Sequence, residues 1–213
     1  MFNKGQLAGL MKQAQAMQDA VPVGKGAMAA ILGMEAAKVI EGCAEAVQSF
    51  GPATQEIVEA VNFNDPLQTV IAGSKAAVDK ACEILKANGA KRALPLPVSA
   101  PFHSSLMKPA ADKLKEKLAG ITLAAPQIPV LNNVDVSIET DAERIREALY
   151  RQAFGPVRWV ECVQAIQAQG LTTLVECGPG KVLAGLAKRI DPALTGTPLF
   201  DPASLAAVKE MLA

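Results

Sequence analysis

The chain has 213 residues, half of them hydrophobic, which is enough for one large domain or two small ones. Lys plus Arg and Asp plus Glu both number 21. The resulting zero net charge argues against binding to nucleic acid or to an anionic membrane surface. No apolar run approaches the roughly 18 residues of a transmembrane helix, and no secretory signal is recognisable, so we expect no membrane association and a cytoplasmic location.

Cysteine and histidine usage excludes several kinds of site. The four cysteines are scattered without a C-x-x-C pair, and the chain has one histidine. These spacings fit neither a zinc site nor a disulfide framework. We therefore expect reduced cysteines, no metal and no cofactor.

A helix over residues 7–20 opens the chain and is broken by proline and glycine at 21–26, which gives an N-terminal helix and linker over residues 1–25. The order β-α-β-β-α-β follows over residues 26–98, typical of a ferredoxin-like subdomain with both helices on one face of an antiparallel sheet. The expected elements are a strand at 27–32, a helix at 35–47, strands at 57–63 and 69–72, a helix at 75–87 and a strand at 92–98.

Residues 99–213 alternate helices with strands, which indicates an α/β fold with a parallel sheet. We expect helices at 106–118, 142–154, 157–168, 182–190 and 204–212, and strands at 129–132 and 173–176. Two or three parallel strands are too few for a complete sheet, because parallel strands need neighbours and helices on both faces. The sequence thus predicts a partial parallel-sheet domain beside the ferredoxin-like subdomain.

His103 is the residue with the clearest chemical potential. It lies between the predicted strand at 92–98 and the helix at 106–118. The positive end of that helix should favour a neutral imidazole, which is the form that a general base needs. The alternative from composition alone is an exposed loop histidine without a function.

Four stretches of the chain occur in the order typical of one enzyme family. They are residues 62–73 (Asn62-Phe63-Asn64-Asp65-Pro66 and onward to Gly73), residues 97–109 around His103, residues 132–134, and residues 177–183. Together they resemble the malonyl-CoA:acyl-carrier-protein transacylases of bacterial fatty acid synthesis. The resemblance extends over residues 14–213.

The resemblance implies a role for each matching residue. His103 would be the catalytic base that deprotonates a serine, and this serine would pass malonyl from coenzyme A to the thiol of acyl carrier protein. Gln152 would help to orient the histidine, although an ordinary residue at a helix end remains an equal alternative. Asn62 and Asn64 would contact the substrate, and malonyl-CoA and acyl carrier protein would be the partners.

Three features depart from the family pattern. No G-x-S-x-G serine elbow and no Gly-Gln-Gly motif occurs in the 213 residues, and Gln13 beside Lys12 stands where the carboxylate-binding arginine is expected. We interpret the chain as the C-terminal part of a transacylase, truncated and inactive by itself, with self-association through exposed sheet edges. The alternative is a non-catalytic binding or assembly module for acyl carrier protein or coenzyme A.

Two further segments allow competing interpretations. Residues 1–18 resemble the opening helix of YbaB-type nucleoid-associated proteins, but the zero net charge argues against DNA contact, and an ordinary amphipathic helix is the alternative. Residues 178–181 (Gly-Pro-Gly-Lys) lie between a strand and a helix, where an anion could bind. Because they do not form a P-loop, a tight turn is favoured there.

Overall fold

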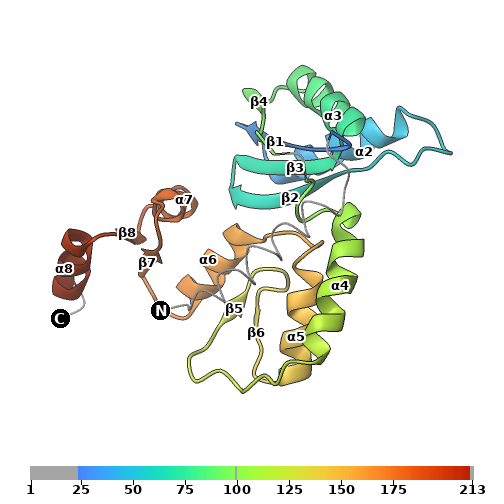
Figure 1. Ribbon diagram of the computed structural model, residues 1–213. Coiled ribbons are helices and arrows are strands. Elements are labelled where there is room, and N and C mark those ends of the chain that lie inside the picture. The colour runs from blue at the N-terminus through green and yellow to red at the C-terminus, as the bar shows by residue number, and fades with distance from the viewer. Residues whose placement is uncertain (1–23, 99, 212–213) are drawn as a thin grey trace.

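The computed structural model describes residues 24–98 and 100–211 (Figure 1). The helix expected at 7–20, the YbaB-like segment 1–18 and the pair Lys12 and Gln13 lie outside the described residues.

The first part of the described chain is a four-stranded antiparallel sheet with the strand order β2-β3-β1-β4. Its elements follow the predicted order β-α-β-β-α-β. Their bounds are β1 (Gly26–Leu32), α2 (Ala36–Gln48), β2 (Val58–Asp65), β3 (Gln68–Ser74), α3 (Lys75–Ala87) and β4 (Arg92–Pro95). The last strand is shorter than expected, because Pro95 and Pro97 have no amide hydrogen to donate to a sheet.

Both helices of this part pack on the same face of the sheet and against each other (Figure 1). Ile31 and Ile71 from the strands and Leu85 from α3 are fully buried between the layers. At Gly42 of α2, a β-carbon would lie 2.4 Å from Cδ2 of Leu85. The absence of a side chain there allows α2 and α3 to pack closely.

The opposite face of the sheet supports the chain around His103. A smaller buried cluster covers this face, and Leu96 and Phe102 pack against it. The cluster consists of Met28, Ala30, Val61, Val70 and Ala72. Because Phe102 directly precedes His103, the sheet fixes the position of the loop after β4 that carries His103, called the histidine loop below.

The remaining residues form helices around two small strand pairs. The elements are the 3₁₀ helix η1 (Ser105–Met107), α4 (Lys108–Ala119), β5 (Leu131–Asn132), β6 (Ser137–Ile138), α5 (Ala142–Arg151), α6 (Trp159–Ala168), β7 (Thr173–Cys177), α7 (Val182–Ile190), β8 (Thr195–Leu199) and α8 (Pro202–Met211). β7 and β8 pair in parallel, with α7 as the crossover. The α/β class predicted from the sequence is confirmed.

The strand expected at 129–132 was assigned to the parallel sheet, and this assignment is wrong. β5 pairs with β6 in an antiparallel hairpin. Its turn is closed by Asn132, whose side chain donates to the Ser137 carbonyl and accepts from the Asp135 amide. Turn chemistry of an asparagine therefore determined the pairing of this short strand.

β8 was not predicted because its sequence, Thr-Gly-Thr-Pro-Leu, contains two residues typical of loops. The glycine is required by packing. A β-carbon at Gly196 would lie 2.5 Å from the Ala184 carbonyl oxygen, so α7 crosses β8 at a distance that only glycine permits. Within the described residues, no helix has the length and apolarity to cross a membrane.

The burial of the cysteines predicts their order of reaction. Burial raises the pKa of the Cys43 thiol to about 12, whereas Cys177 is exposed. Because the thiolate is the reactive form, iodoacetamide should modify Cys177 first and Cys43 last in the folded protein. Timed alkylation followed by peptide mass spectrometry measures this order. Equal alkylation rates of Cys43 and Cys177 in the folded chain would contradict the packing of α2. Urea-unfolded protein is the control, in which all four cysteines should react alike.

Candidate active site

His103 has a left-handed backbone conformation, with a φ of 64°. This conformation costs a non-glycine residue about 1–3 kcal/mol and persists only where the surroundings impose it. Here the next residue anchors the turn, because the buried hydroxyl of Ser104 donates to the Pro101 carbonyl at 2.6 Å. The amide of Met107 then donates to the Ser104 carbonyl at 2.9 Å, which begins the helical segment.

The imidazole of His103 is fixed by a main-chain acceptor on another helix. Its Nδ1 lies 2.9 Å from the carbonyl oxygen of Gln152, the residue that ends α5. A carbonyl oxygen can only accept, so Nδ1 carries the proton. In the neutral ring the lone pair is then on Nε2, which becomes the basic nitrogen.

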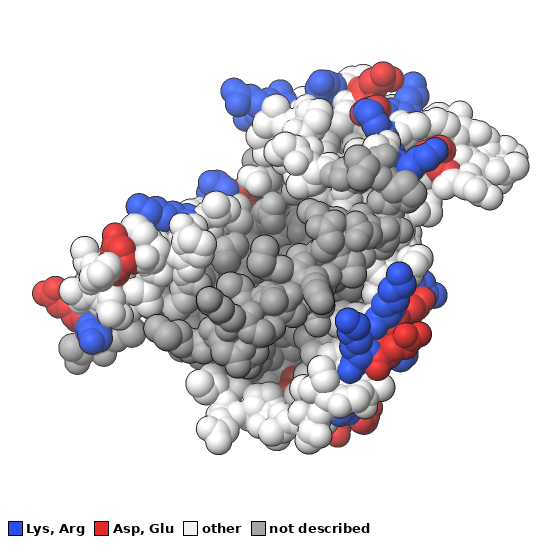
Figure 2. Space-filling view, viewed as in Figure 1, with Lys and Arg blue, Asp and Glu red and all other residues white. Residues whose placement is uncertain are grey.

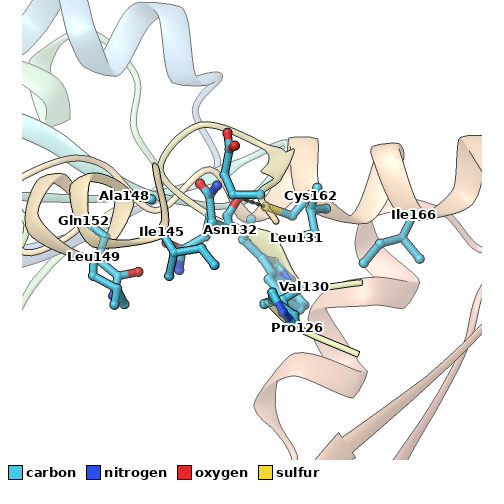
Figure 3. A pocket seen from close by; sticks show the side chains of 13 residues that line it. Pro126, Val130, Leu131, Asn132, Ile145, Ala148, Leu149, Gln152, Cys162 and Ile166 are labelled. Carbon is cyan, nitrogen blue, oxygen red and sulfur yellow. Dashed lines mark hydrogen bonds between the residues drawn. The ribbon is translucent and has the colours of Figure 1, made fainter. Parts of the chain in front are cut away.

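The structure brings together two of the predicted site residues, His103 and Gln152. Gln152 makes this contact through its backbone, so the identity of its side chain is not what orients the ring. Gln152 also lines a cavity of about 370 Å³ between α5, α6 and β5 (Figure 3). Most of the cavity's other residues are apolar, among them Val130, Ile145 and Leu149.

Asn62 and Asn64 lie at irregular positions of β2. The register of β2 with β3 shifts between Ala60 and Asn62 and again between Phe63 and Asp65. Such bulges can change the direction of side chains and are frequent beside functional sites. Both asparagines are half-buried.

β2 is joined to the Gln152 region by the segment that leads into α6. The Val157 amide donates to the Val61 carbonyl at 2.7 Å, and the Phe63 amide donates to the Val157 carbonyl at 2.9 Å. Thus the short segment 152–157 contacts His103 at one end and the asparagine strand at the other. Within the described residues, no hydrogen bond links either asparagine to His103.

Two carboxylates near this site have roles that the sequence did not suggest. The Glu59 carboxylate on β2 accepts from the Ser105 amide at 2.7 Å, two residues after the histidine. Buried Asp65 lies 2.7 Å from Nε of Arg189 on α7 and accepts from the Leu67 amide. Asp65 thus ties the β2–β3 hairpin to α7.

The start of the helix after the glycine loop at 178–181 is capped by the protein's own carboxylate. Glu176 of β7 accepts from the Ala184 amide at 2.8 Å, in the first turn of α7. This contact satisfies one of the amides that would otherwise bind an anion. Together with its position between β7 and α7, the contact supports a tight strand-to-helix turn at this loop. In the described part of the chain, no three His, Cys, Asp or Glu side chains are grouped to hold a metal ion.

The geometry defines a loop histidine that donates through Nδ1 and keeps a basic Nε2, on an α/β fold. The acyl transferase domain family matches residues 6–191, and the chain belongs to this family. Among curated proteins, the malonyl CoA-acyl carrier protein transacylase of Escherichia coli K12 is 53% identical over 195 residues. The corresponding protein of Bacillus subtilis is 44% identical over 194 residues. The match covers 92% and 91% of this chain, but only 61% and 60% of the two relatives.

Solved structures agree with this assignment. The acyl-carrier-protein S-malonyltransferase of Burkholderia pseudomallei 1710b has a TM-score of 0.90 at 60% identity. A malonyl-transacylase in complex with a type II polyketide synthase acyl-carrier protein has a TM-score of 0.91 at 50% identity. The matches cover 97% and 98% of this chain and 65% of each of those chains. The chain therefore spans about three fifths to two thirds of the length of the relatives it matches.

Two substitutions of His103 separate the side-chain contact from the backbone conformation. His103→Ala removes the hydrogen bond to Gln152, which should lower the free energy of unfolding by about 1 kcal/mol, and it retains the left-handed backbone cost. His103→Gly removes the same bond but relieves that cost, so it should be the more stable variant by about 1 kcal/mol. Urea denaturation of the two proteins measures the difference.

Loss of the hydrogen bond to Gln152 alone predicts only a modest decrease in the free energy of unfolding of both variants. A loss of several kcal/mol in both would mean that the imidazole is a structural core group and would contradict its interpretation as a half-buried base.

Proposed function

We propose that this chain supplies the histidine-bearing part of a malonyl-CoA:acyl-carrier-protein transacylase site. The observation that carries the proposal is the bond from His103 Nδ1 to the Gln152 carbonyl. It leaves Nε2 as the nitrogen that takes a proton, and it supports the positive charge when the ring becomes imidazolium. The similarity to named transacylases supports the same chemistry.

In the proposed reaction, His103 removes the proton from a serine hydroxyl, and the serine oxygen attacks the malonyl thioester carbon. Coenzyme A leaves as its thiol after taking the proton back from the imidazolium. The second half reverses these steps with the thiol of acyl carrier protein as the nucleophile. Asn62 and Asn64 are proposed as substrate contacts, since they lie on the part of β2 whose backbone bonds to Val157, a few residues beyond Gln152.

We further propose that the 213-residue chain forms no acyl-enzyme by itself. Its sequence contains no G-x-S-x-G elbow. The hydroxyl of Ser104, next to the histidine, is fully buried and donates to Pro101, so it is a poor substitute. The similarity to transacylases does not favour the alternative of a pure binding module.

A chimera tests the role of His103. The matched segment of the Escherichia coli relative is replaced by this chain, so that the relative's unmatched part supplies the serine elbow expected of the family. We expect malonyl transfer from malonyl-CoA to acyl carrier protein, and a 10²- to 10⁴-fold lower rate in His103→Ala, because general-base catalysis contributes this much. Radiolabelled malonyl transfer measures both rates.

The unmodified chain is the control for the chimera. It should show no malonyl adduct by intact-protein mass spectrometry. A stoichiometric adduct on this chain would disprove its proposed inactivity, and an unchanged rate in the His103→Ala chimera would disprove the proposed base.

The proposed partners follow from the same similarity. One related structure is a complex of a malonyl-transacylase with an acyl-carrier protein. We propose malonyl-CoA and acyl carrier protein as partners of this chain and a cytoplasmic location. Among the described residues on the face shown in Figure 2, most Lys and Arg lie near Asp or Glu, and these residues form no extended area of one sign, which does not favour nucleic acid.

Self-association is proposed for the β7–β8 region. Among the described strands, each of the two pairs only with the other, so each has an open edge. Large apolar side chains are exposed nearby, with Leu171 54% and Val182 66% accessible. Open strand edges and exposed apolar surface favour association between chains. We also propose that residues 26–98 and 99–213 unfold as separate units.

Lysine substitutions test this association. The double variant Leu171→Lys, Val182→Lys should shift the protein toward monomer, because two charges replace apolar surface beside the open edges. Sedimentation velocity at several concentrations measures the shift. Ile40→Lys, at an exposed apolar position of α2, is the matched control and should change nothing. A wild-type chain that is monomeric with one sharp thermal transition would contradict both the association and the separate unfolding.

A further inference from the structure

Within the described residues, Glu59 is the one side chain of the four-stranded sheet that accepts a hydrogen bond from the start of the helical segment after His103. Its carboxylate oxygen lies 2.7 Å from the Ser105 amide, and the two residues are 46 positions apart in the chain. Glu59 itself is held in β2, opposite Ala72 of β3. The contact therefore connects the sheet to the histidine loop at a defined point.

The Ser105 amide needs an external acceptor. Ser105 begins the helical segment formed by η1 and α4, and the first amides of a helix have no partner within the helix. Ser104 stands at the N-cap position, but its side chain makes no cap bond, and its hydroxyl donates to the Pro101 carbonyl. A serine at this position would accept from the second or third amide of the helix and not from the first. The first amide, that of Ser105, is paired by Glu59, which is a charged acceptor.

This cap acts on the backbone of His103. The histidine is held from both sides, by Phe102 against the sheet and by Ser105 against Glu59. Its left-handed φ of 64° has to be imposed by such neighbours. The direction of the imidazole toward the Gln152 carbonyl follows from that backbone conformation.

We propose that Glu59 is a positioning residue for His103: by capping Ser105 it holds the histidine in the conformation in which Nδ1 donates to Gln152 and Nε2 stays basic. The inference rests on the proposed function of His103 as the base. It adds a residue of the small sheet to the site without requiring that this carboxylate contact the substrate.

The tautomer of the ring provides a measurement that does not depend on activity. His103 is the only histidine of the chain, so its ring nitrogens can be observed without assignment by long-range ¹H–¹⁵N NMR above the ring's titration range. The wild-type chain should show the Nδ1–H tautomer. Glu59→Ala should lose it and show a mixture with Nε2–H, while Glu59→Gln should keep it, because a glutamine oxygen can also accept from the Ser105 amide.

Controls make the result decisive. Glu41→Ala, at an exposed position of α2, should leave the tautomer unchanged. Glu59→Asp, whose carboxylate is one methylene too short to reach the Ser105 amide, should give the same tautomer mixture as Glu59→Ala. If the alanine variant does not fold, the aspartate variant serves as the test in its place. An unchanged Nδ1–H tautomer in folded Glu59→Ala or Glu59→Asp would overturn the proposal, and so would failure of both variants to fold, since Glu59 would then serve the fold.

The tautomer measurement and the activity of the chimera together distinguish the positioning role of Glu59 from the proposed function of His103. A wild-type chain with the Nδ1–H tautomer and an inactive chimera would disprove the proposed function and leave the positioning by Glu59 intact. An active chimera with no effect of Glu59 on the tautomer would do the reverse.

Discussion

The contact between His103 Nδ1 and the carbonyl oxygen of Gln152 joins elements that are far apart in the sequence, at a distance of 2.9 Å. It requires the histidine loop to meet the end of α5, which in turn requires α4 and α5 to pack together. The acceptor is a main-chain atom at a helix end, where carbonyl groups lack partners within the helix. One bond thus pairs a carbonyl at the helix end and determines which nitrogen of the ring is basic.

The four-stranded sheet contributes to this site from the other side. Phe102 packs on the open face of the sheet, Glu59 caps the helix that follows the histidine, and Asp65 holds Arg189 of α7. The bulged strand β2 also bonds to the backbone of Val157, a few residues beyond Gln152. The antiparallel sheet therefore supports the site through its edge strand, in addition to enclosing its own core.

The C-terminal part has a different balance of interactions. β5–β6 and β7–β8 are two separate two-stranded sheets, and several large apolar side chains around them are exposed. In contrast, both helices of the four-stranded part bury a continuous apolar face. This difference is the physical basis for expecting separate unfolding and self-association, and it agrees with a chain that covers about 61% of its curated relatives.

The sequence by itself determined the elements with a strong pattern. The limits of α3 match the prediction, and the strands from β1 to β3 agree within a few residues, because their apolar periodicity is a local signal. It also singled out His103 and Gln152 through the family resemblance.

Tertiary structure decided what local signals cannot encode. β8 pairs with β7 despite its loop-like sequence, and its Gly196 is required because α7 crosses it closely. The short strand at Leu131 turns back on itself through Asn132. Gln152 acts through a carbonyl that every residue type possesses, so no side-chain pattern could have revealed the contact. The contacts of Glu59 with Ser105 and of Asp65 with Arg189 join residues 46 and 124 positions apart, and only packing of the whole chain brings them together.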